Sequence, residues 1–473
     1  MSVIESVRYI LPEIILTGFA LASLILGLFI KKKGFLGALC LAGILLAVLS
    51  LQESYKAASP LFSGMLLNDS FSEFFKEISL LVAGLIILIS MGYRPFSGED
   101  SGEYYFLLLT VAVAMMFAVS SNNLIMIYIA LEAVSLISYI LVGFLKRDVL
   151  SSEGALKYFL FGALSTGIML YGISFIYGLF GTTDLSAISA ALEAGDVNNF
   201  TAFISLVLIL AGLCFKCALV PFHMWVPDAY QGAPTPIAAF ISVGPKAIGF
   251  AILIRIFLKN FFPLFPNWVD IITVISIFTM TAGNLIAISQ DNIKRMLGYS
   301  SIAQAGYILI GFAVGTPLGV EGSLLYILAY VLMNLGAFGC VVLVSNSIKS
   351  DEIKDYAGLY KKDPAIAFML TIFLLSLAGI PPLAGFLGKF LVFAAAIESR
   401  FILLAVAGVI NSVVALYYYV RVVKFMYLDE PRTFEAQPRP ISLQIALIVA
   451  LAGILIVGLF PLPFLDWIAA SLL

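Results

Sequence analysis

The chain has 473 residues, of which 62% are hydrophobic and 11% are charged, and its formal net charge is −2. A soluble domain carries about a quarter charged residues, so this composition indicates an integral membrane protein and excludes a soluble one. The near-neutral charge and the lack of a basic block argue against a nucleic-acid partner. Four cysteines, all in apolar stretches, do not form a disulfide framework.

Apolar stretches long enough to cross a bilayer, about 20 residues each, follow one another along the whole chain. They predict an all-α polytopic membrane protein with fourteen transmembrane helices, near residues 9–30, 34–51, 74–92, 104–120, 123–145, 154–180, 202–226, 235–258, 268–289, 294–314, 322–346, 364–396, 400–427 and 441–464. The first stretch runs into Lys31, Lys32 and Lys33 rather than a small-residue cleavage site, and we therefore expect a retained span.

Positive charges gather in the loops that follow odd-numbered spans. The loops on the other side hold only Arg8, Lys56, Lys259 and Arg400 outside the helices. Since cytoplasmic loops carry the excess of lysine and arginine, both termini are predicted to face away from the cytoplasm. The bias is typical of the cytoplasmic (inner) membrane of a bacterium, although an organellar membrane would look alike.

Two short sequence segments recur at an offset of 168 residues. Ser138-Tyr-Ile-Leu-Val-Gly-Phe144 returns as Gly306-Tyr-Ile-Leu-Ile-Gly-Phe312, and Glu153-Gly-Ala-Leu-Lys157-Tyr returns as Glu321-Gly-Ser-Leu-Leu325-Tyr. Five spans separate the copies, so the second would be inverted across the membrane, which is a transporter architecture. The pattern predicts two inverted five-helix repeats, spans 4–8 and 9–13, and a division into 1–103, 104–258, 259–427 and 428–473.

Each repeat contains a predicted break in a helix. Span 7 is broken at Pro221, and span 12 is broken at Pro381 and Pro382. Proline removes a backbone donor, so the freed carbonyls need protein or water partners. Lys216 precedes the first break by five residues and Lys389 follows Pro382 by seven, which favours a functional site over prolines that merely kink a helix for packing.

Several ionisable residues fall well inside spans, where a charge is costly and marks an ion or proton pathway by default: Glu132, Lys157, Lys216, Lys246 and Lys389. Glu132 needs a cation, and Lys216 is the expected partner. A buried lysine whose carboxylate partner moves can bind and release a proton. A fixed ion pair is the alternative for Glu132, and Lys157 lies near a span end. Arg255, Arg421 and Lys424 are expected to reach an interface.

His223, the single histidine, follows the first break directly. It could relay protons between Lys216 and Lys246, or it could cap the freed backbone groups. Cys214 and Cys217 form a Cys-x-x-Cys pair around Lys216, but without a second pair they are better read as apolar filler than as metal ligands. No glycine-rich nucleotide motif follows a strand.

The segment Phe215-Lys216-Cys-Ala-Leu-Val-Pro221-Phe222-His223-Met224-Trp225-Val-Pro227-Asp228 and its continuation to Lys246 resemble the subunit N family of proton-pumping NADH:quinone oxidoreductase, respiratory complex I. Leu11-Pro12-Glu13, Leu131-Glu132, the segment 291–301 and Gly379-Ile-Pro-Pro-Leu-Ala-Gly-Phe386 with Lys389 carry the same resemblance, which covers essentially the whole chain.

The resemblance implies one of three antiporter-like subunits of the membrane arm. In that family the span 5 glutamate and span 7 lysine form a coupled pair, the span 8 lysine continues the polar axis, and the span 12 lysine leads outward. These positions match Glu132, Lys216, Lys246 and Lys389. NADH, FMN, iron-sulfur clusters and quinone would belong to partner subunits, and the neighbours would be adjacent antiporter-like and small membrane subunits in the lipid bilayer.

Two other functions are compatible with the same residues. A subunit of a multisubunit Na⁺/H⁺ antiporter, or of a related redox-driven pump that does not use NADH, shares this ancestry. A static membrane scaffold would use the buried charges as packing pairs only.

Overall fold

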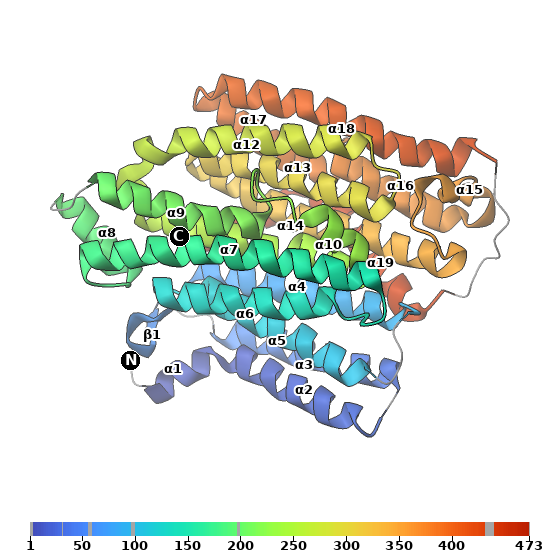
Figure 1. The fold of residues 1–473 in the computed structure, drawn as a ribbon, viewed down its shortest axis with the longest axis horizontal. Coiled ribbons are helices and arrows are strands. Elements are labelled where there is room, and N and C mark those ends of the chain that lie inside the picture. The colour runs from blue at the N-terminus through green and yellow to red at the C-terminus, as the bar shows by residue number, and fades with distance from the viewer. Residues whose placement is uncertain are drawn as a thin grey trace.

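The computed structural model describes residues 3–30, 32–54, 59–95, 100–195, 199–430 and 439–472. Lys31 and Lys56, which entered the prediction of orientation, lie outside these ranges. The described chain is a bundle of long helices that run side by side (Figure 1). The N-terminal helices form one edge of the bundle, and α12 and α18 lie at the opposite edge.

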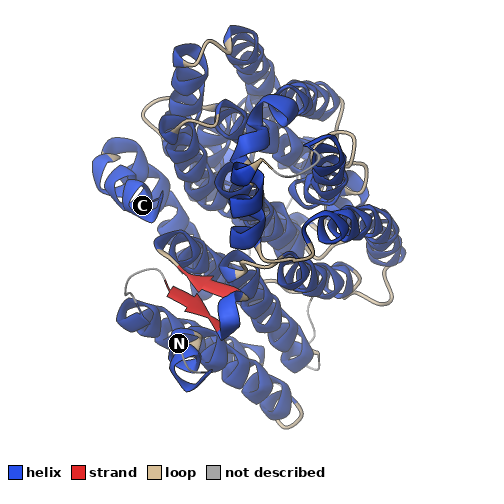
Figure 2. Cartoon of the chain, turned by 90° about the vertical axis from the view of Figure 1, so that its left-hand side faces the viewer, coloured by secondary structure: helices blue, strands red, loops and turns tan. Residues whose placement is uncertain are grey.

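The first half of the chain forms ten helices and one hairpin among the described residues. The helices are α1 (Val3–Tyr9), α2 (Leu11–Gly27), α3 (Lys33–Ser54), α4 (Ser70–Met91), α5 (Ser101–Ser120), α6 (Leu124–Val142), α7 (Val149–Phe180), α8 (Leu185–Ala194), α9 (Asn199–Cys217) and α10 (Val226–Gly232). Strands β1 (Ser59–Leu61) and β2 (Leu66–Asn68) pair antiparallel around the short turn η1 (Phe62–Gly64), with Pro60 opposite Leu67 (Figure 2).

The second half begins with α11 (Thr235–Leu253), which continues into the π-helical η2 (Ile254–Asn260). The remaining elements are η3 (Phe262–Leu264), α12 (Phe265–Ile288), α13 (Ile293–Val314), α14 (Pro317–Ile348), η4 (Ile353–Tyr356), α15 (Leu359–Lys362), α16 (Pro364–Ala378), α17 (Ala384–Glu398), α18 (Ile402–Leu428), α19 (Ile441–Leu459) and α20 (Leu462–Leu472).

Twelve helices of the described residues are long and apolar enough to cross a membrane. The fourteen predicted spans all correspond to helical segments, but two of them fall short of that length. Helix α2 has 17 residues, and the predicted span 364–396 is divided into α16 and α17 with 15 residues each. The hairpin, α8 and α20 were not predicted.

Asparagine side chains fix the starts of α6 and α13 in the same way. Asn123 accepts hydrogen bonds from the second and third residues of α6, and Asn292 does so for α13, each satisfying backbone donors that a helix start leaves open. The backbone of Asn123 also forms an isolated antiparallel β-bridge with Asp184, and that of Asn292 forms one with Glu352. The two asparagines are 169 residues apart, close to the 168-residue offset of the repeated sequence segments.

The core of the bundle lies around α11, α13 and α14. The most apolar windows of α11 and α14 are entirely buried, and that of α13 is 94% buried, whereas that of α7 is 39% buried. Helices α7 and α14 both have 32 residues and begin 168 residues apart. Helix α14 is therefore central in the bundle, while α7 lies at its surface.

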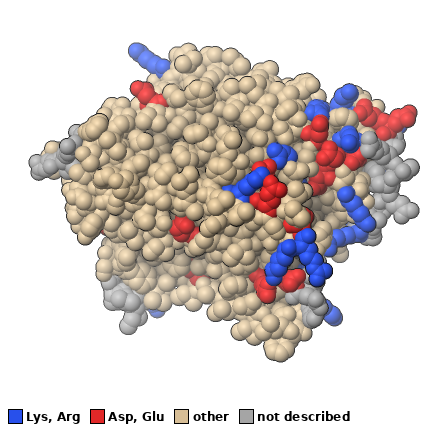
Figure 3. Space-filling model, in the orientation of Figure 1, with Lys and Arg blue, Asp and Glu red and all other residues tan. Residues whose placement is uncertain are grey.

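Charged side chains are scarce over most of the visible surface (Figure 3). They gather at one end of the bundle, near α15, and in a group over α7 and α10. A largely apolar surface with its charges gathered in few places is typical of a protein that spans a bilayer.

Candidate functional site

Helix α9 is interrupted where the sequence predicts. It ends at Cys217, Ala218 adopts a positive φ of 58°, and Val220-Pro221 is a cis peptide bond before α10 begins at Val226. The Val220 N–H donates to Oγ1 of Thr279 on α12 at 3.0 Å. A side chain of a neighbouring helix thus satisfies one backbone group that the break frees.

Lys216 lies in the last turn of α9 and is 3% exposed. Its Nζ donates to the backbone oxygen of Leu131 on α6 at 3.3 Å. The expected ion pair with Glu132 is wrong as a direct contact, because no such pair within 4.0 Å is found among the described residues. Glu132 is the next residue after Leu131, and its buried Oε1 has no hydrogen-bond partner there. The two groups are neighbours that do not touch.

Lys246 lies in the middle of α11 and is 2% exposed. Its Nζ donates to the Oγ and the backbone oxygen of Ser301 on α13, at 2.8 and 2.9 Å. The Ser301 hydroxyl also lies 3.1 Å from the Tyr230 hydroxyl. Close packing of α9 on α11 depends on Gly249, because a Cβ there would lie 2.7 Å from Cys217 Sγ. These contacts hold Lys246 and the α9 break next to one another.

Helix α13 connects Lys246 to the second break. Gln304 lies three residues after Ser301, on the same face, and its Nε2 donates to the backbone oxygen of Leu377 at 2.9 Å and to the Tyr419 hydroxyl at 3.1 Å. Its Oε1 accepts a hydrogen bond from the Tyr326 hydroxyl. Polar side chains on α13 therefore extend from Lys246 to the end of α16.

The second break divides the predicted span 12. Helix α16 ends at Ala378, Gly379 adopts a φ of 92°, and Pro381-Pro382 is a cis peptide bond before α17 begins at Ala384. Lys389, 3% exposed, returns from α17 and donates to the backbone oxygens of Leu377 and Ala378 at 3.2 and 2.9 Å. The lysine satisfies the Ala378 carbonyl that this break frees and shares the Leu377 carbonyl with Gln304.

Two predicted residues lie apart from these polar side chains. Lys157 is at the surface, 40% exposed in its side chain, and pairs with Glu153 at 2.6 Å and with Asp228 at 2.7 Å. Arg295 joins the same Asp228 at 2.7 Å. His223 lies in the segment between α9 and α10, 8% exposed, and its Nδ1 has no hydrogen-bond partner among the described residues.

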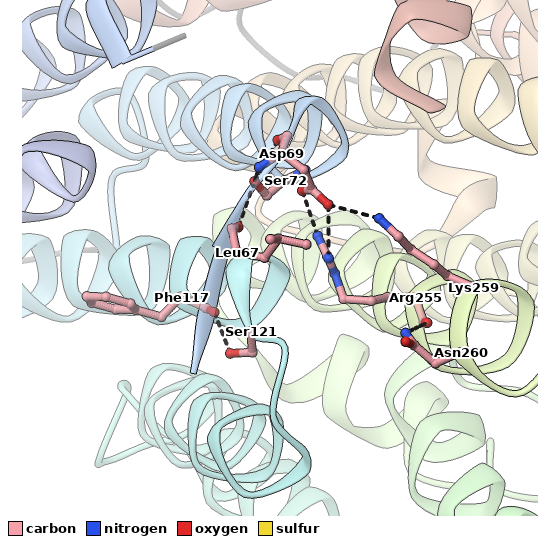
Figure 4. Close-up of polar contacts among 8 residues, drawn as sticks. All are labelled: Leu67, Asp69, Ser72, Phe117, Ser121, Arg255, Lys259 and Asn260. Atoms are coloured by element: carbon pink, nitrogen blue, oxygen red, sulfur yellow. Dashed lines mark hydrogen bonds and ion pairs between the residues drawn. The ribbon is translucent and has the colours of Figure 1, made fainter. Parts of the chain in front are cut away.

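A buried charge cluster at the start of α4 was missed by the sequence analysis. Arg255 is 1% exposed and donates to both carboxylate oxygens of Asp69, at 2.9 and 3.1 Å, while Lys259 approaches the same group at 3.2 Å (Figure 4). The guanidinium of Arg255 is thus enclosed by protein and paired with Asp69, while its expected place at a membrane interface stays a prediction. Burial alone would raise the pKa of Asp69, but the charges of Arg255 and Lys259 hold it at about 2.

A second missed ion pair joins α2 and α4. Lys76 Nζ lies 2.8 Å from Oε1 of Glu13, and both side chains are 2% exposed. Lys76 is the third residue of the predicted span 74–92, so its position in an apolar stretch was a usable signal. Cys214 and Cys217 are buried free thiols, and the described residues contain no group of three or more metal-ligating side chains.

Comparisons with known proteins identify the family of this chain. The model of the family "NADH:quinone oxidoreductase/Mrp antiporter, TM" matches residues 121–415. NADH-quinone oxidoreductase subunit N of Trichlorobacter lovleyi is 43% identical over 96% of this chain and 95% of its own length. A chain of respiratory complex I from Thermus thermophilus with bound aureothin is 32% identical, with a TM-score of 0.84 over 97% of this chain and all of that one.

A more distant relative shares the fold alone. It is a chain of the membrane-bound sulfane sulfur reductase, an archaeal respiratory membrane complex, which is 23% identical with a TM-score of 0.86 over 97% of this chain. The matching family model and the likeness to a chain of complex I show that this chain is an antiporter-like membrane protein. More closely, the chain belongs to the family of NADH:quinone oxidoreductase subunit N.

Proposed function

We propose that this chain is a membrane-arm subunit of a proton-translocating NADH:quinone oxidoreductase, and that it moves protons through Glu132, Lys216, Lys246 and Lys389. One observation carries the relay. The three lysines are at least 97% buried, yet their ammonium groups bond only to neutral oxygens of Leu131, Ser301, Leu377 and Ala378 among the described residues. A buried ammonium that bonds only neutral oxygens releases its proton readily, because burial penalises the charged form.

The relay has a defined order. A proton on Lys216 passes toward Lys246, whose helix is in contact with α9 through Gly249 and Cys217. Ser301, Gln304 and their tyrosine partners lead from Lys246 to Lys389. Glu132 acts on Lys216 through its charge, since a carboxylate nearby favours the ammonium form. We count His223, which lies at the first break, among the relay residues, and we keep Lys157, which pairs with Asp228 at the surface, as a further candidate.

The membrane topology proposed here has fourteen spans. Helix α2 and the broken pair α16 and α17 supply the two beyond the twelve long helices. The matching starts of α6 and α13 and the equal lengths of α7 and α14 support two repeats, 104–258 and 259–427, related by inversion across the membrane. Residues 1–103 and 428–473 flank them. Both termini face away from the cytoplasm of a bacterial cell.

Electron transfer takes place elsewhere in the proposed complex. NADH, FMN, iron-sulfur clusters and quinone belong to partner subunits, and this chain contributes no redox group. Its partners are the neighbouring antiporter-like and small membrane subunits of the membrane arm. Relatives named as subunits of NADH-quinone oxidoreductase and complete complex I assemblies among the similar structures support this.

A Na⁺/H⁺ antiporter subunit is the second candidate, because the matching family model covers both kinds of protein. Purification of the tagged chain from its own membrane distinguishes them. Flavin and iron-sulfur subunits that copurify with it support the oxidoreductase, whereas copurification of other antiporter subunits alone would reject it.

The relay is tested by Lys216→Met and Glu132→Gln in the assembled complex. We expect each variant to assemble at normal yield and to lose most of its NADH-driven proton pumping, measured as acidification of inverted vesicles. Lys361→Gln, an exposed change on α15, is the control. Normal pumping in a fully assembled Lys216→Met complex would reject the relay and leave the scaffold role.

A further inference from the structure

Two hollows of opposite charge lie next to one another where α4 begins. The first has a volume of about 290 Å³ and the second about 420 Å³, and both are lined by Ser70 of α4 and Ser471 of α20. Neither hollow includes a residue of the proposed relay. Because α4 and α14 both begin here, the hollows lie at the end of the membrane-spanning region, at the depth of lipid headgroups.

The larger hollow is basic. Asp69, Arg255 and Lys259 line it, so one positive charge remains after the carboxylate is counted (Figure 4). The Nε of the buried Arg255 has no hydrogen-bond partner among the described residues. Thr316, the N-cap of α14, and Pro317, its first residue, line the same hollow, and a helix start favours anions. The hollow therefore suits a phosphate group.

The smaller hollow is acidic. Glu73 and Glu77, one turn apart on α4, line it without a lysine or arginine, and the buried Oε1 of Glu73 has no hydrogen-bond partner among the described residues. The nearby Lys76 pairs instead with Glu13. Trp467 of α20 also lines this hollow and packs on Phe74 with ring centroids 4.6 Å apart. Two carboxylates and an indole favour a cation that can donate hydrogen bonds.

We propose that the two hollows together bind the headgroup of a phospholipid with a primary amine, such as phosphatidylethanolamine. The phosphate lies in the basic hollow beside Lys259 and Arg255, and the ammonium lies in the acidic hollow between Glu73 and Glu77. Ile254, Leu258 and Val320 line the basic hollow and contact the glycerol and upper acyl chains. Trp467 occupies the headgroup level that tryptophan favours in membrane proteins.

Native mass spectrometry of the intact, delipidated complex tests the proposal. The complex is offered equal amounts of phosphatidylethanolamine, phosphatidylglycerol and phosphatidylcholine that differ in mass. We expect the first to be retained roughly tenfold better than the others, which is the scale of a charge-assisted hydrogen bond. Phosphatidylglycerol has no ammonium for the acidic hollow, and the choline group has no N–H donor.

Two variants separate the two halves of the site. Glu77→Gln weakens retention of phosphatidylethanolamine while leaving phosphatidylglycerol unchanged or better held, and Lys259→Gln weakens both. Glu398→Gln and Lys361→Gln, exposed changes elsewhere, are matched controls without effect. Proton pumping is not the readout, so failure of this proposal leaves the proposed relay untouched.

Three results would overturn the proposal. Equal retention of the three lipids in the unchanged complex would show no headgroup recognition. Full displacement of the lipid by inorganic phosphate would reduce the site to a free-anion site. Retention that is unchanged by both Glu77→Gln and Lys259→Gln would place the bound lipid elsewhere on the complex.

Discussion

The two broken helices differ in what satisfies the backbone groups that each break frees. At the second break, the ammonium of Lys389 binds the carbonyls of Leu377 and Ala378. At the first, Thr279 accepts the Val220 N–H, and Lys216 turns away to Leu131 on another helix. Lys389 therefore supports its own helix and carries charge, whereas Lys216 has no part in holding its break together. Two buried lysines, each beside a helix break, thus have different structural roles.

The largest expected effect is that of Lys389→Met, which tests whether Lys389 supports its own helix break. The change leaves the buried carbonyl of Ala378 without its side-chain donor, at a cost of about 1–3 kcal/mol, and leaves that of Leu377 with Gln304 alone. We therefore expect the yield of assembled complex to fall severalfold and pumping to be lost. We expect the complex with Lys216→Met to assemble at normal yield, because the change removes only one hydrogen bond of 3.3 Å to the carbonyl of Leu131. Assembly is measured by the NADH dehydrogenase activity that comigrates with the complex in native gels.

The opposite pattern would contradict the comparison. If Lys389→Met assembles as well as the unchanged chain while Lys216→Met does not, the first lysine is the structural one. Lys389→Arg is a useful control, because it keeps donors near Leu377 and Ala378 while altering proton release.

The backbone at the two breaks provides the next prediction. Gly379 has a φ of 92°, and a Cβ there would lie 2.9 Å from Cδ of Lys389, so Gly379→Ala is strained and displaces the lysine. The first break has Ala218 at a φ of 58°, a region where a Cβ costs about 1–2 kcal/mol. We expect Gly379→Ala to lower the melting temperature of the purified complex and Ala218→Gly to leave it unchanged or slightly raised. Equal losses at both sites would show that the positive φ does not determine the outcome at either break.

A substitution at Ser301 tests the polar connection between the two helix breaks. Ser301→Ala removes one hydrogen bond from the Lys246 ammonium and the contact with Tyr230, which is worth about 1.5–3 kcal/mol for a charged donor. We expect the pumping rate to fall by roughly tenfold with normal assembly. Ser323→Ala is the matched control, since that hydroxyl bonds the backbone of Ile308 and touches no lysine. Equal rates in the two variants would remove Ser301 from the path.

Much of the lysine pattern was predictable because it depends on local sequence. An ionisable residue in an apolar stretch and a proline within it are visible without a structure, so Lys216, Lys389 and both breaks were predicted. The family match confirmed the class of protein. The positions of the long helices followed from apolar length alone.

The partners of those lysines were not predictable. Ser301 and Gln304 are ordinary polar residues in sequence, and only the packing of α13 between α11 and α16 brings them to Lys246 and Leu377. The partner of Arg255 was not predictable for the same reason, because Asp69 is 186 residues away. Contacts between distant helices depend on the fold, which apolar periodicity does not specify.

The smallest expected effect concerns Asp228, just beyond the first break. Burial alone would raise the pKa of Asp228, but hydrogen bonds from Lys157 and Arg295 hold it below its ordinary value. A carboxyl with a lowered pKa stabilises the fold above its ordinary pKa and loses that contribution as the pH falls through the lowered value. These ion pairs therefore persist from pH 5 to pH 8, and they are partly exposed and weak. We expect Asp228→Asn to lower the melting temperature slightly and by the same amount at both pH values, without loss of pumping. A loss of pumping equal to that of Lys216→Met would instead make Asp228 part of the proton path at the first break.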